Sequence, residues 1–167
     1  MIPAHIDAYA FRMDGHDFVN GATEVKLPKL ARKTEDFRNG AIDGVRKIDV
    51  GQEAMEMEIT LKGHDKDALG LWGVMNGQGF TFQIFANLDD DNGLDTPVVI
   101  RGRGSVDEWD PDNLKSDEVG TVKLKISLTM FSYSEGGEEV VHIDVDQMVR
   151  SINGVDQLEK KRANIGV

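Results

Sequence analysis

The sequence contains no cysteine, and this absence removes several kinds of chemistry at once. Disulfides, zinc thiolate sites and cysteine nucleophiles are excluded across all 167 residues. Long apolar runs are also missing: the longest span a few residues, whereas a membrane-spanning helix needs about 20. The opening residues, MIPAHIDAYAFRMDG, hold neither a basic region nor an apolar core, so they do not resemble a secretory signal. We therefore expect a protein that works without Sec export and without a membrane anchor.

Positive charge is scarce and unevenly placed. The 19 Lys and Arg residues stand against 30 Asp and Glu residues, which gives a formal net charge of −11. Such a balance argues against a surface that grips phosphates, because that binding needs a concentrated basic footprint. Lys26 to Lys47 nevertheless holds seven basic residues against three acidic ones, and a second basic cluster covers Lys160 to Arg162. This separation is either plain solvation or a sign that one part of a subunit meets the opposite part of its neighbour.

No arrangement of residues predicts catalysis. The four histidines are scattered, no H-E-x-x-H is present, and no serine sits in a G-x-S-x-G elbow. Glu56 and Glu58 share one strand face, where carboxylates usually just meet water, whereas glycosidase pairs lie across a cleft. We therefore predict a protein that is not an enzyme and that has no cofactor and no metal.

The segment Asp89 to Gly93 invites a calcium interpretation, but its spacing is wrong. With Gly93 at the sixth position of an EF-hand loop, the first position is Leu88 and the twelfth is Val99, and neither can bind calcium. A solvated hairpin turn explains the segment better.

The remaining patterns predict mainly β structure. Met55 to Lys62 and Val122 to Met130 alternate apolar and polar residues with the period of two expected of half-buried strands. Asp65 begins the one mid-chain helix, with Ala68, Leu69, Leu71, Trp72 and Met75 as its apolar stripe. About seven strands with Gly-rich turns favour two packed antiparallel sheets, a barrel-like sandwich with one flanking helix. Trp109 to Gly120 is interpreted as an acidic connection.

A long arm between two strands is the least ordinary feature. A first strand is predicted over Glu24 to Lys33, with Pro28 at an edge or bulge, and the alternating strand from Met55 follows the arm. Between them, residues 34–53 show no sustained period. Loops of that length are uncommon in compact domains and are usually functional or disordered. The segment carries apolar residues that a free linker would not need, namely Phe37, Ile42, Val45, Ile48 and Val50. We therefore predict an arm that becomes ordered against a partner.

The C-terminal part is predicted to be a strand followed by an extension. A last strand covers Glu138 to Val145, and the extension covers residues 146–167, with a break at Asn153-Gly154 before a short charged helix at Val155 to Ala163. The whole chain, residues 1–167, is expected to form a single domain.

Several motifs resemble one family of proteins. The N-terminal motifs are Leu27-Pro28-Lys29-Leu30, Lys33-Thr34-Glu35, Arg38-x-Gly40 and Gly51-x-Glu53-Ala54-Met55-Glu56. The C-terminal motifs are tighter: Ile143-Asp144, Ile152-Asn153-Gly154-Val155-Asp156-Gln157-Leu158, Arg162 and the closing Asn164-Ile165-Gly166-Val167. With the opening Met1-Ile2-Pro3, the chain resembles the major tail tube protein of contractile-tailed phages, R-type pyocins and other tailocins.

The resemblance implies a structural function and a set of partners. Six copies would form a ring whose inner sheets join into one barrel, and the rings would stack into a hollow tube inside a contractile sheath. The implied partners are further copies of the chain, the sheath, the tape-measure protein, and the baseplate and terminator proteins. DNA would pass without specific binding in a phage. The implied place is the virion tail or a tailocin particle, assembled in the cytoplasm of the bacterial host.

The same resemblance gives the arm and one strand face specific roles. The arm would reach a neighbouring subunit or ring through Phe37, Arg38, Ile42 and Arg46. If the apolar residues of the Met55 strand point inward, Glu56, Glu58 and Thr60 point away and are candidates for the wall of the bore. Carboxylates there would repel a polyanion. The strand could instead lie in the outer wall.

Two other functions remain open at this stage. A type VI secretion tube component would have the same architecture, although the C-terminal motif argues against it. A monomeric β-domain that binds a ligand or calcium would explain Asp89 to Asp91 but not the arm with its apolar residues.

Overall fold

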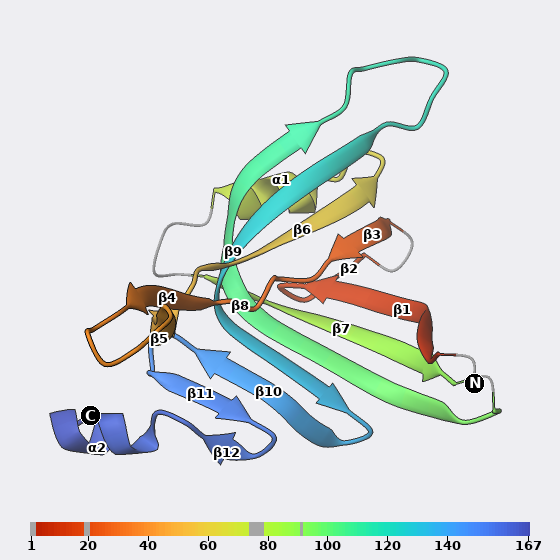
Figure 1. The fold of residues 1–167 in the computed structure, drawn as a ribbon. Coiled ribbons are helices and arrows are strands. Elements are labelled where there is room, and N and C mark those ends of the chain that lie inside the picture. Colours follow the sequence, from red (N-terminus) through yellow and green to blue (C-terminus); the bar gives the residue numbers. More distant parts are fainter. Residues whose placement is uncertain (1–2, 19–20, 74–78, 91) are drawn as a thin grey trace.

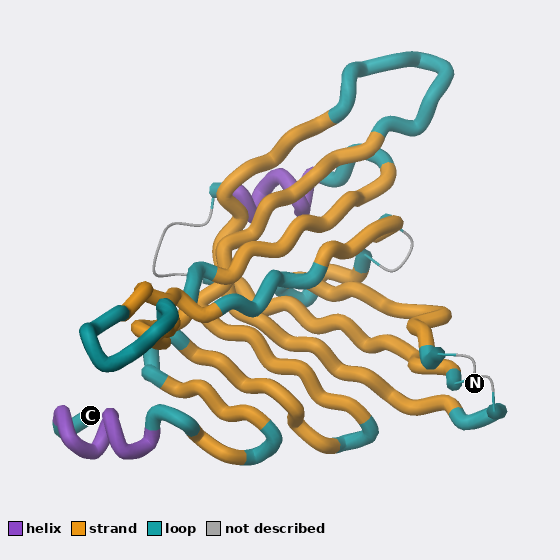
Figure 2. The backbone as a smooth tube through the Cα atoms, in the orientation of Figure 1, coloured by secondary structure: helices purple, strands orange, loops and turns teal. Residues whose placement is uncertain are grey.

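The computed structural model describes residues 3–18, 21–73, 79–90 and 92–167, which form antiparallel β structure with two short helices (Figures 1 and 2). The elements in chain order are β1 (His5–Met13), β2 (His16–Asp17), β3 (Ala22–Lys26), β4 (Arg32–Phe37), β5 (Arg46–Gln52), β6 (Met55–Lys62), α1 (Lys66–Trp72), β7 (Phe80–Asp89), β8 (Asp95–Pro111), β9 (Thr121–Glu135), β10 (Glu138–Asp144), β11 (Val149–Ile152), β12 (Val155–Asp156) and α2 (Glu159–Ile165). The predicted mainly β class is confirmed.

A ten-stranded sheet makes the body, and it divides at β9. The strand order is β12-β11-β10-β9-β8-β7-β1-β2, with β6 paired to β9 and β3 paired to β6. The long strand β9 pairs with β6 up to Leu128 and with β10 from Met130 onward. The sheet therefore folds into two layers. We call β3-β6-β9-β8 the four-stranded layer, and the strands β1, β7, β8, β9, β10 and β11 the large layer.

The core lies between these layers and follows the period of two. Every second residue of β6 and of the first half of β9 is buried: Met55, Met57, Ile59 and Leu61 in β6, and Val122, Leu124, Ile126 and Leu128 in β9. The large layer adds the buried aromatic rings of Phe11 in β1 and Phe82 in β7. Full burial of one such side chain stabilises the fold by about 1.5–3 kcal/mol. Along β9 the next buried side chain is Phe131 rather than Met130, because Thr129 is an extra residue in β9 where the pairing with β8 shifts between Arg103 and Gly104.

Two glycines allow β8 to pass from one layer to the other. A Cβ atom at Gly104 would lie 2.1 Å from the carbonyl oxygen of Ser127, and one at Gly102 would lie 2.3 Å from the ring of Phe82. At both positions the neighbouring atoms leave no room for a side chain.

The helix α1 flanks the body as predicted. Asp65 is its N-cap and accepts a hydrogen bond of 2.8 Å from the backbone N–H of Asp67. Ala68 and Leu71 are buried in the core, while the indole N–H of the exposed Trp72 donates to the Asp107 carbonyl at 3.3 Å. Met75, the last residue of the predicted apolar stripe, lies outside the described residues.

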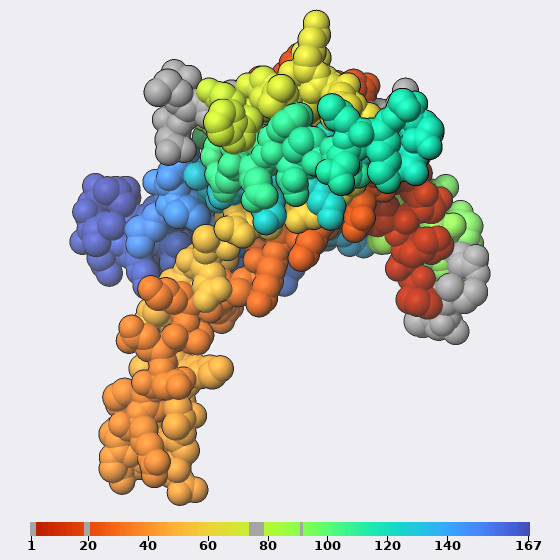
Figure 3. Space-filling view, turned by 90° about the horizontal axis from the view of Figure 1, so that it is seen from above, coloured from red at the N-terminus to blue at the C-terminus, as the bar shows by residue number. Residues whose placement is uncertain are grey.

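The arm is a β-hairpin and not the patternless loop that was predicted. β4 and β5 form a separate two-stranded sheet, with Arg32 opposite Gln52 and Phe37 opposite Arg46. It projects far from the body (Figure 3). The alternation in β5 was missed because it is short, and because both faces of the hairpin lie at the surface.

Other predicted boundaries also need correction. The first strand does not continue to Lys33: β3 ends at Lys26, and residues 27–31 form no strand. The predicted acidic connection begins later, since β8 runs to Pro111. The extension holds two short strands before the helix, which begins at Glu159 and not at Val155. The described residues form twelve strands rather than about seven, because the arm adds β4 and β5 and because β2, β11 and β12 have only two to four residues each.

The body is open rather than a closed barrel. Among the described residues no ladder joins β2 with β3, so both strands remain at edges of the sheet. The predicted hairpin turn after β7 is confirmed, since Asp89 of β7 pairs with Asp95 of β8. In the described part of the chain, neither helix has the length and apolar character that crossing a membrane requires.

Candidate functional site

The arm has one apolar face and one polar face. The strand period places Phe37 and Glu35 of β4 on the same side as Ile48 and Arg46 of β5, because these residues pair across the hairpin. Phe37 and Ile48 on that side are exposed, with Phe37 at 41%, and the exposed Val50 lies where the pairing shifts between Lys33 and Thr34. The opposite face carries Thr34, Asp36, Lys47 and Asp49. An isolated hairpin of two strands is marginally stable in water, so this apolar face is suited to a partner surface.

The predicted arm residues come together at its outer end. Phe37 and Arg46 pair across the hairpin, and exposed Arg38 follows directly. Between them the chain turns on Asn39, whose carbonyl accepts from Ile42 N–H at 3.2 Å. Ile42 is half-buried, so it contributes to the turn as well as to the surface. The tip therefore offers apolar groups beside two exposed guanidinium groups.

An ion-pair cluster joins the base of the arm to the body. Asp49 of β5 contacts Nη2 of Arg150 in β11 at 3.2 Å and Nε of Arg32 at 3.7 Å. Its other oxygen accepts from the backbone N–H of Gly51 at 3.0 Å. The Gly51 hydrogen bond, followed by the charges of Arg150 and Arg32, lowers the pKa of Asp49. The Arg150 side chain is only 12% exposed.

A second polar cluster orders the C-terminal extension that holds β11. Arg162 of α2 pairs with Asp156 and donates from Nη1 to the Met148 carbonyl at 2.8 Å. The hydrogen bond from Arg162, together with the N–H of Leu158, lowers the pKa of Asp156, and the same pairing raises the pKa of Arg162. The extension is thereby fastened against the turn between β10 and β11.

The outward face of the four-stranded layer carries the predicted bore residues. Because Met55, Met57 and Ile59 are buried, Glu56, Glu58 and Thr60 face away from the core on β6.

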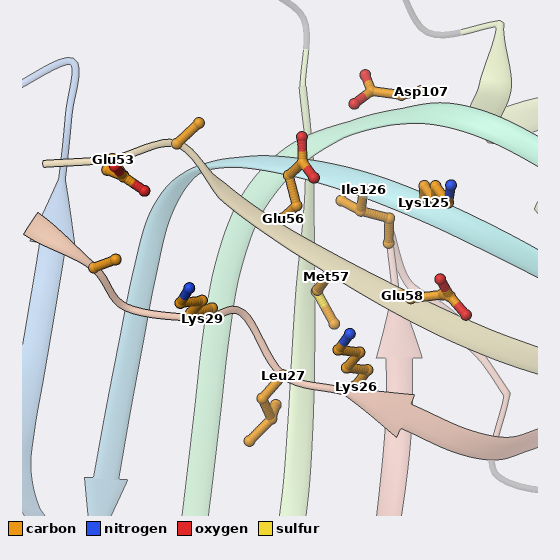
Figure 4. A pocket seen from close by; sticks show the side chains of 12 residues that line it. Lys26, Leu27, Lys29, Glu53, Glu56, Met57, Glu58, Asp107, Lys125 and Ile126 are labelled. Atoms are coloured by element: carbon orange, nitrogen blue, oxygen red, sulfur yellow. The ribbon is translucent and has the colours of Figure 1, made fainter. Parts of the chain in front are cut away.

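Lysines lie beside these carboxylates, which the sequence pattern did not predict. Glu58 pairs across the strands with Lys26 of β3 and with Lys125 of β9, and Lys125 also contacts Glu108 of β8 at 3.4 Å. Figure 4 shows Glu58, Lys26 and Lys125 around a groove of about 330 Å³ beside β3 and β6. The face is mixed in charge, and a series of exposed carboxylates and amines crosses it.

Both edges of the four-stranded layer are unpaired in the described residues. β3 pairs with β6 on one side, and β8 beyond Gly104 pairs with β9 on one side. Unpaired edges present backbone donors and acceptors that another strand can satisfy. The Asp107 carbonyl on the β8 edge is already bonded to Trp72.

The site is therefore a set of surfaces, and its chemistry is that of assembly. In the described residues no group of three His, Asp or Glu side chains could hold a metal ion. Asp49 and Arg150 were missed by sequence reasoning. The only signals were an Asp inside the alternation of β5 and an Arg inside the C-terminal strand, separated by 101 residues.

Comparison with known proteins gives a consistent result. The family described as phage tail tube protein FII matches residues 3–166. The chain is 31% identical to the tail tube protein of Escherichia phage P2, over 93% of this chain and 92% of that protein. It is 22% identical to the major tail tube protein of Serratia phage KSP20, over 92% of this chain and 90% of that protein.

Solved structures share the fold at much lower identity. The tube terminating cap of the anti-feeding prophage aligns with a TM-score of 0.62 at 10% identity, covering 80% of this chain and 92% of that one. The sheath-tube complex of an extracellular contractile injection system, PVC, aligns with a TM-score of 0.58 at 9% identity, covering 80% and 91%.

Proposed function

The chain belongs to the phage tail tube protein FII family and is a structural protein rather than an enzyme; from this premise we propose that six copies form a ring and that the rings stack into the inner tube of a contractile tail. The tail is that of a phage or of a tailocin. The observation that carries the proposal is the pair of unpaired edges on the four-stranded layer.

Ring closure follows from those edges. When β3 of one copy lies beside the free part of β8 in the next, the four-stranded layers continue into one sheet around the ring. Every copy then satisfies the edge of its neighbour, and closure leaves no edge of the four-stranded layers exposed. The exposed part of β8 beyond Asp107 supports this arrangement, because Trp72 occupies only the Asp107 carbonyl among the described contacts.

Stacking is assigned to the arm. Its exposed apolar face needs a cover, and its projection from the body gives it reach beyond its own ring (Figure 3). Phe37 and Ile42 supply apolar contacts, while Arg38 and Arg46 supply charge for the acidic body of another copy.

The bore is lined by the outward face of the four-stranded layer, including Glu56, Glu58 and Thr60. In a continuous inner sheet, this face is turned toward the axis while the large layer lies outside it. The outside of the tube then meets the sheath, and the ends of the tube meet the baseplate and the terminator proteins. Relatives of the same fold come from a sheath-tube complex and a tube terminating cap, which supports these partners. The tape-measure protein and, in a phage, DNA occupy the bore. Assembly takes place in the cytoplasm of the bacterial host.

Sedimentation and negative-stain microscopy of the purified chain test this proposal together. We expect hexamers, and polymers at high protein concentration, with rings or hollow tubes in the images. A compact monomer that persists at high concentration would contradict the proposal.

A further inference from the structure

One ion pair joins the arm to the C-terminal extension of the body. Arg150 and Asp49 lie 101 residues apart in the chain, and Nη2 of Arg150 contacts Oδ2 of Asp49 at 3.2 Å. Other hydrogen bonds join the two chain segments at the base of the arm to each other: the Ala31 carbonyl accepts from the N–H of Glu53 at 3.0 Å and from Nε2 of Gln52 at 3.1 Å. Those bonds close the base of the hairpin but do not fix its direction.

Arg150 is held in place by the body before it reaches the arm. It pairs with Ile143 in β10, and its carbonyl accepts from the N–H of Gln157 at 2.8 Å. Its Nε is buried without a hydrogen-bond partner in the described structure, so the guanidinium is desolvated and directed at Asp49. A buried guanidinium that lacks one partner has a strong need for its remaining one.

We propose that Arg150 is an arm-positioning residue, and that the C-terminal extension acts as a bracket that sets the direction of the arm in the free subunit. The inference rests on the proposed function in one respect, since the use of a preset arm is to meet the next ring. An arm whose direction is already fixed loses its conformational entropy during folding rather than during assembly, which favours stacking.

The absence of cysteine allows a direct test on the full chain. Spin labels are placed at Gly44→Cys in the outer part of the arm and at Thr81→Cys on β7, both in surface positions. Pulsed electron resonance then measures the distance distribution in dilute, unassembled subunit. We expect a single narrow distribution in the parent, a broad one in Arg150→Met, and an intermediate one in Arg150→Lys, which keeps charge but loses the planar fork.

Matched controls separate positioning from general damage. Arg101→Met removes an exposed arginine from β8 and should keep the narrow distribution. Asp49→Asn removes the negative charge that Arg150 contacts and changes a residue of the arm rather than of the body. It should broaden the distance distribution, and it keeps the test usable if Arg150→Met folds poorly. Circular dichroism checks folding. Equal distributions in the parent, Arg150→Met and Asp49→Asn would overturn the inference.

Tube formation gives a second, independent readout. Arg150→Met should form fewer or shorter tubes than Arg101→Met at equal concentration. If the parent forms no tubes, the proposed function fails while the distance measurement still decides the role of Arg150. If Arg150→Met forms tubes as readily as Arg101→Met, the bracket has no role in stacking and the inference is wrong.

Discussion

Single atoms decide where β8 can bend. A Cβ atom at Gly104 would meet the Ser127 carbonyl carbon and oxygen, which are backbone atoms of the paired strand and cannot rotate away. We expect Gly104→Ala to destabilise the fold by about 1–3 kcal/mol, as overpacking of a close contact does. Urea unfolding followed by circular dichroism measures this change.

Gly44→Ala is the matched control for that substitution. No heavy atom lies within 4 Å of a Cβ atom built at Gly44 in the arm. Its effect should stay within about 0.5 kcal/mol, the usual range for a surface position. Equal effects at the two glycines would show that the contact with Ser127 does not limit β8.

The carboxylate of Asp49 also gives a prediction at this scale, in its pH dependence. The Gly51 N–H and two arginines lower the pKa of Asp49 in the folded chain. The contribution of the Asp49 carboxylate to the free energy of unfolding is therefore fully present above the ordinary Asp pKa of about 3.9. It is lost as the pH falls below that pKa and through the lowered pKa of the folded chain. The amide proton of Gly51 reports this titration by NMR, and its midpoint should lie below about 3.9.

Arg150→Met should move that midpoint upward, because one of the two guanidinium groups is lost. A Gly51 midpoint that is the same in both proteins would mean that Arg150 does not contact the carboxylate in solution.

At the scale of elements, the arm makes a separable unit whose loss should spare the body. Its strands pair with each other and not with the ten-stranded sheet. We expect a deletion of residues 39–46 to leave a folded subunit with nearly normal circular dichroism that builds no tubes. Microscopy and sedimentation measure tube formation, and tubes of normal length would show that the arm is not the stacking element.

Two double substitutions locate the contact on one face of the arm. Phe37→Ser with Ile48→Ser changes the exposed apolar face, and Asp36→Ser with Lys47→Ser changes the opposite face. The first pair should abolish tubes and the second should reduce them far less, since burial of apolar area supplies the association energy. Equal loss in both would argue for a contact that covers the whole arm.

The contrast between elements shows what local pattern can predict. β6 and the first half of β9 were predictable because one face of each is buried along its whole length, which forces the alternation of residues. The end of β8 was not, since Asp107, Glu108 and Asp110 resemble a turn and a bulge between Val106 and Glu108 breaks the period. The direction of the arm depends on Arg150 and Asp49, and no local pattern reports a contact across 101 residues.

At the scale of the whole molecule, two layers back to back give the subunit two faces with different environments. The four-stranded layer has free edges on both sides, whereas the large layer continues through β10 to β12. In the proposed ring, built on the free edges, the face of Glu56 and Glu58 would be turned toward the axis. The bore then repeats a pattern of carboxylates with lysines beside them, including Lys26 and Lys125, rather than carboxylates alone.

That mixed pattern makes the charge of the bore easy to reverse. Replacing both Glu56 and Glu58 with Lys adds two amines per subunit to a face that already exposes Lys26, Lys62, Lys123 and Lys125. Assembly should survive, because exposed strand positions usually change stability by about 0.5 kcal/mol. The tube should then retain DNA, and the retention should weaken steeply as salt is raised, since phosphate binding releases counterions.

The comparison that decides the location of this face uses a second double variant. Asp89→Lys with Asp95→Lys makes the same change in charge at the turn between β7 and β8, away from the four-stranded layer. If the bore is lined by Glu56 and Glu58, DNA held by the first variant should resist nuclease added outside the tube, because the proposed ring would enclose it. DNA held by the turn variant should be digested. Should the Glu56 and Glu58 variant bind no more DNA than the parent tube, or only digestible DNA, these residues lie on the outer wall and the four-stranded layer does not line the bore.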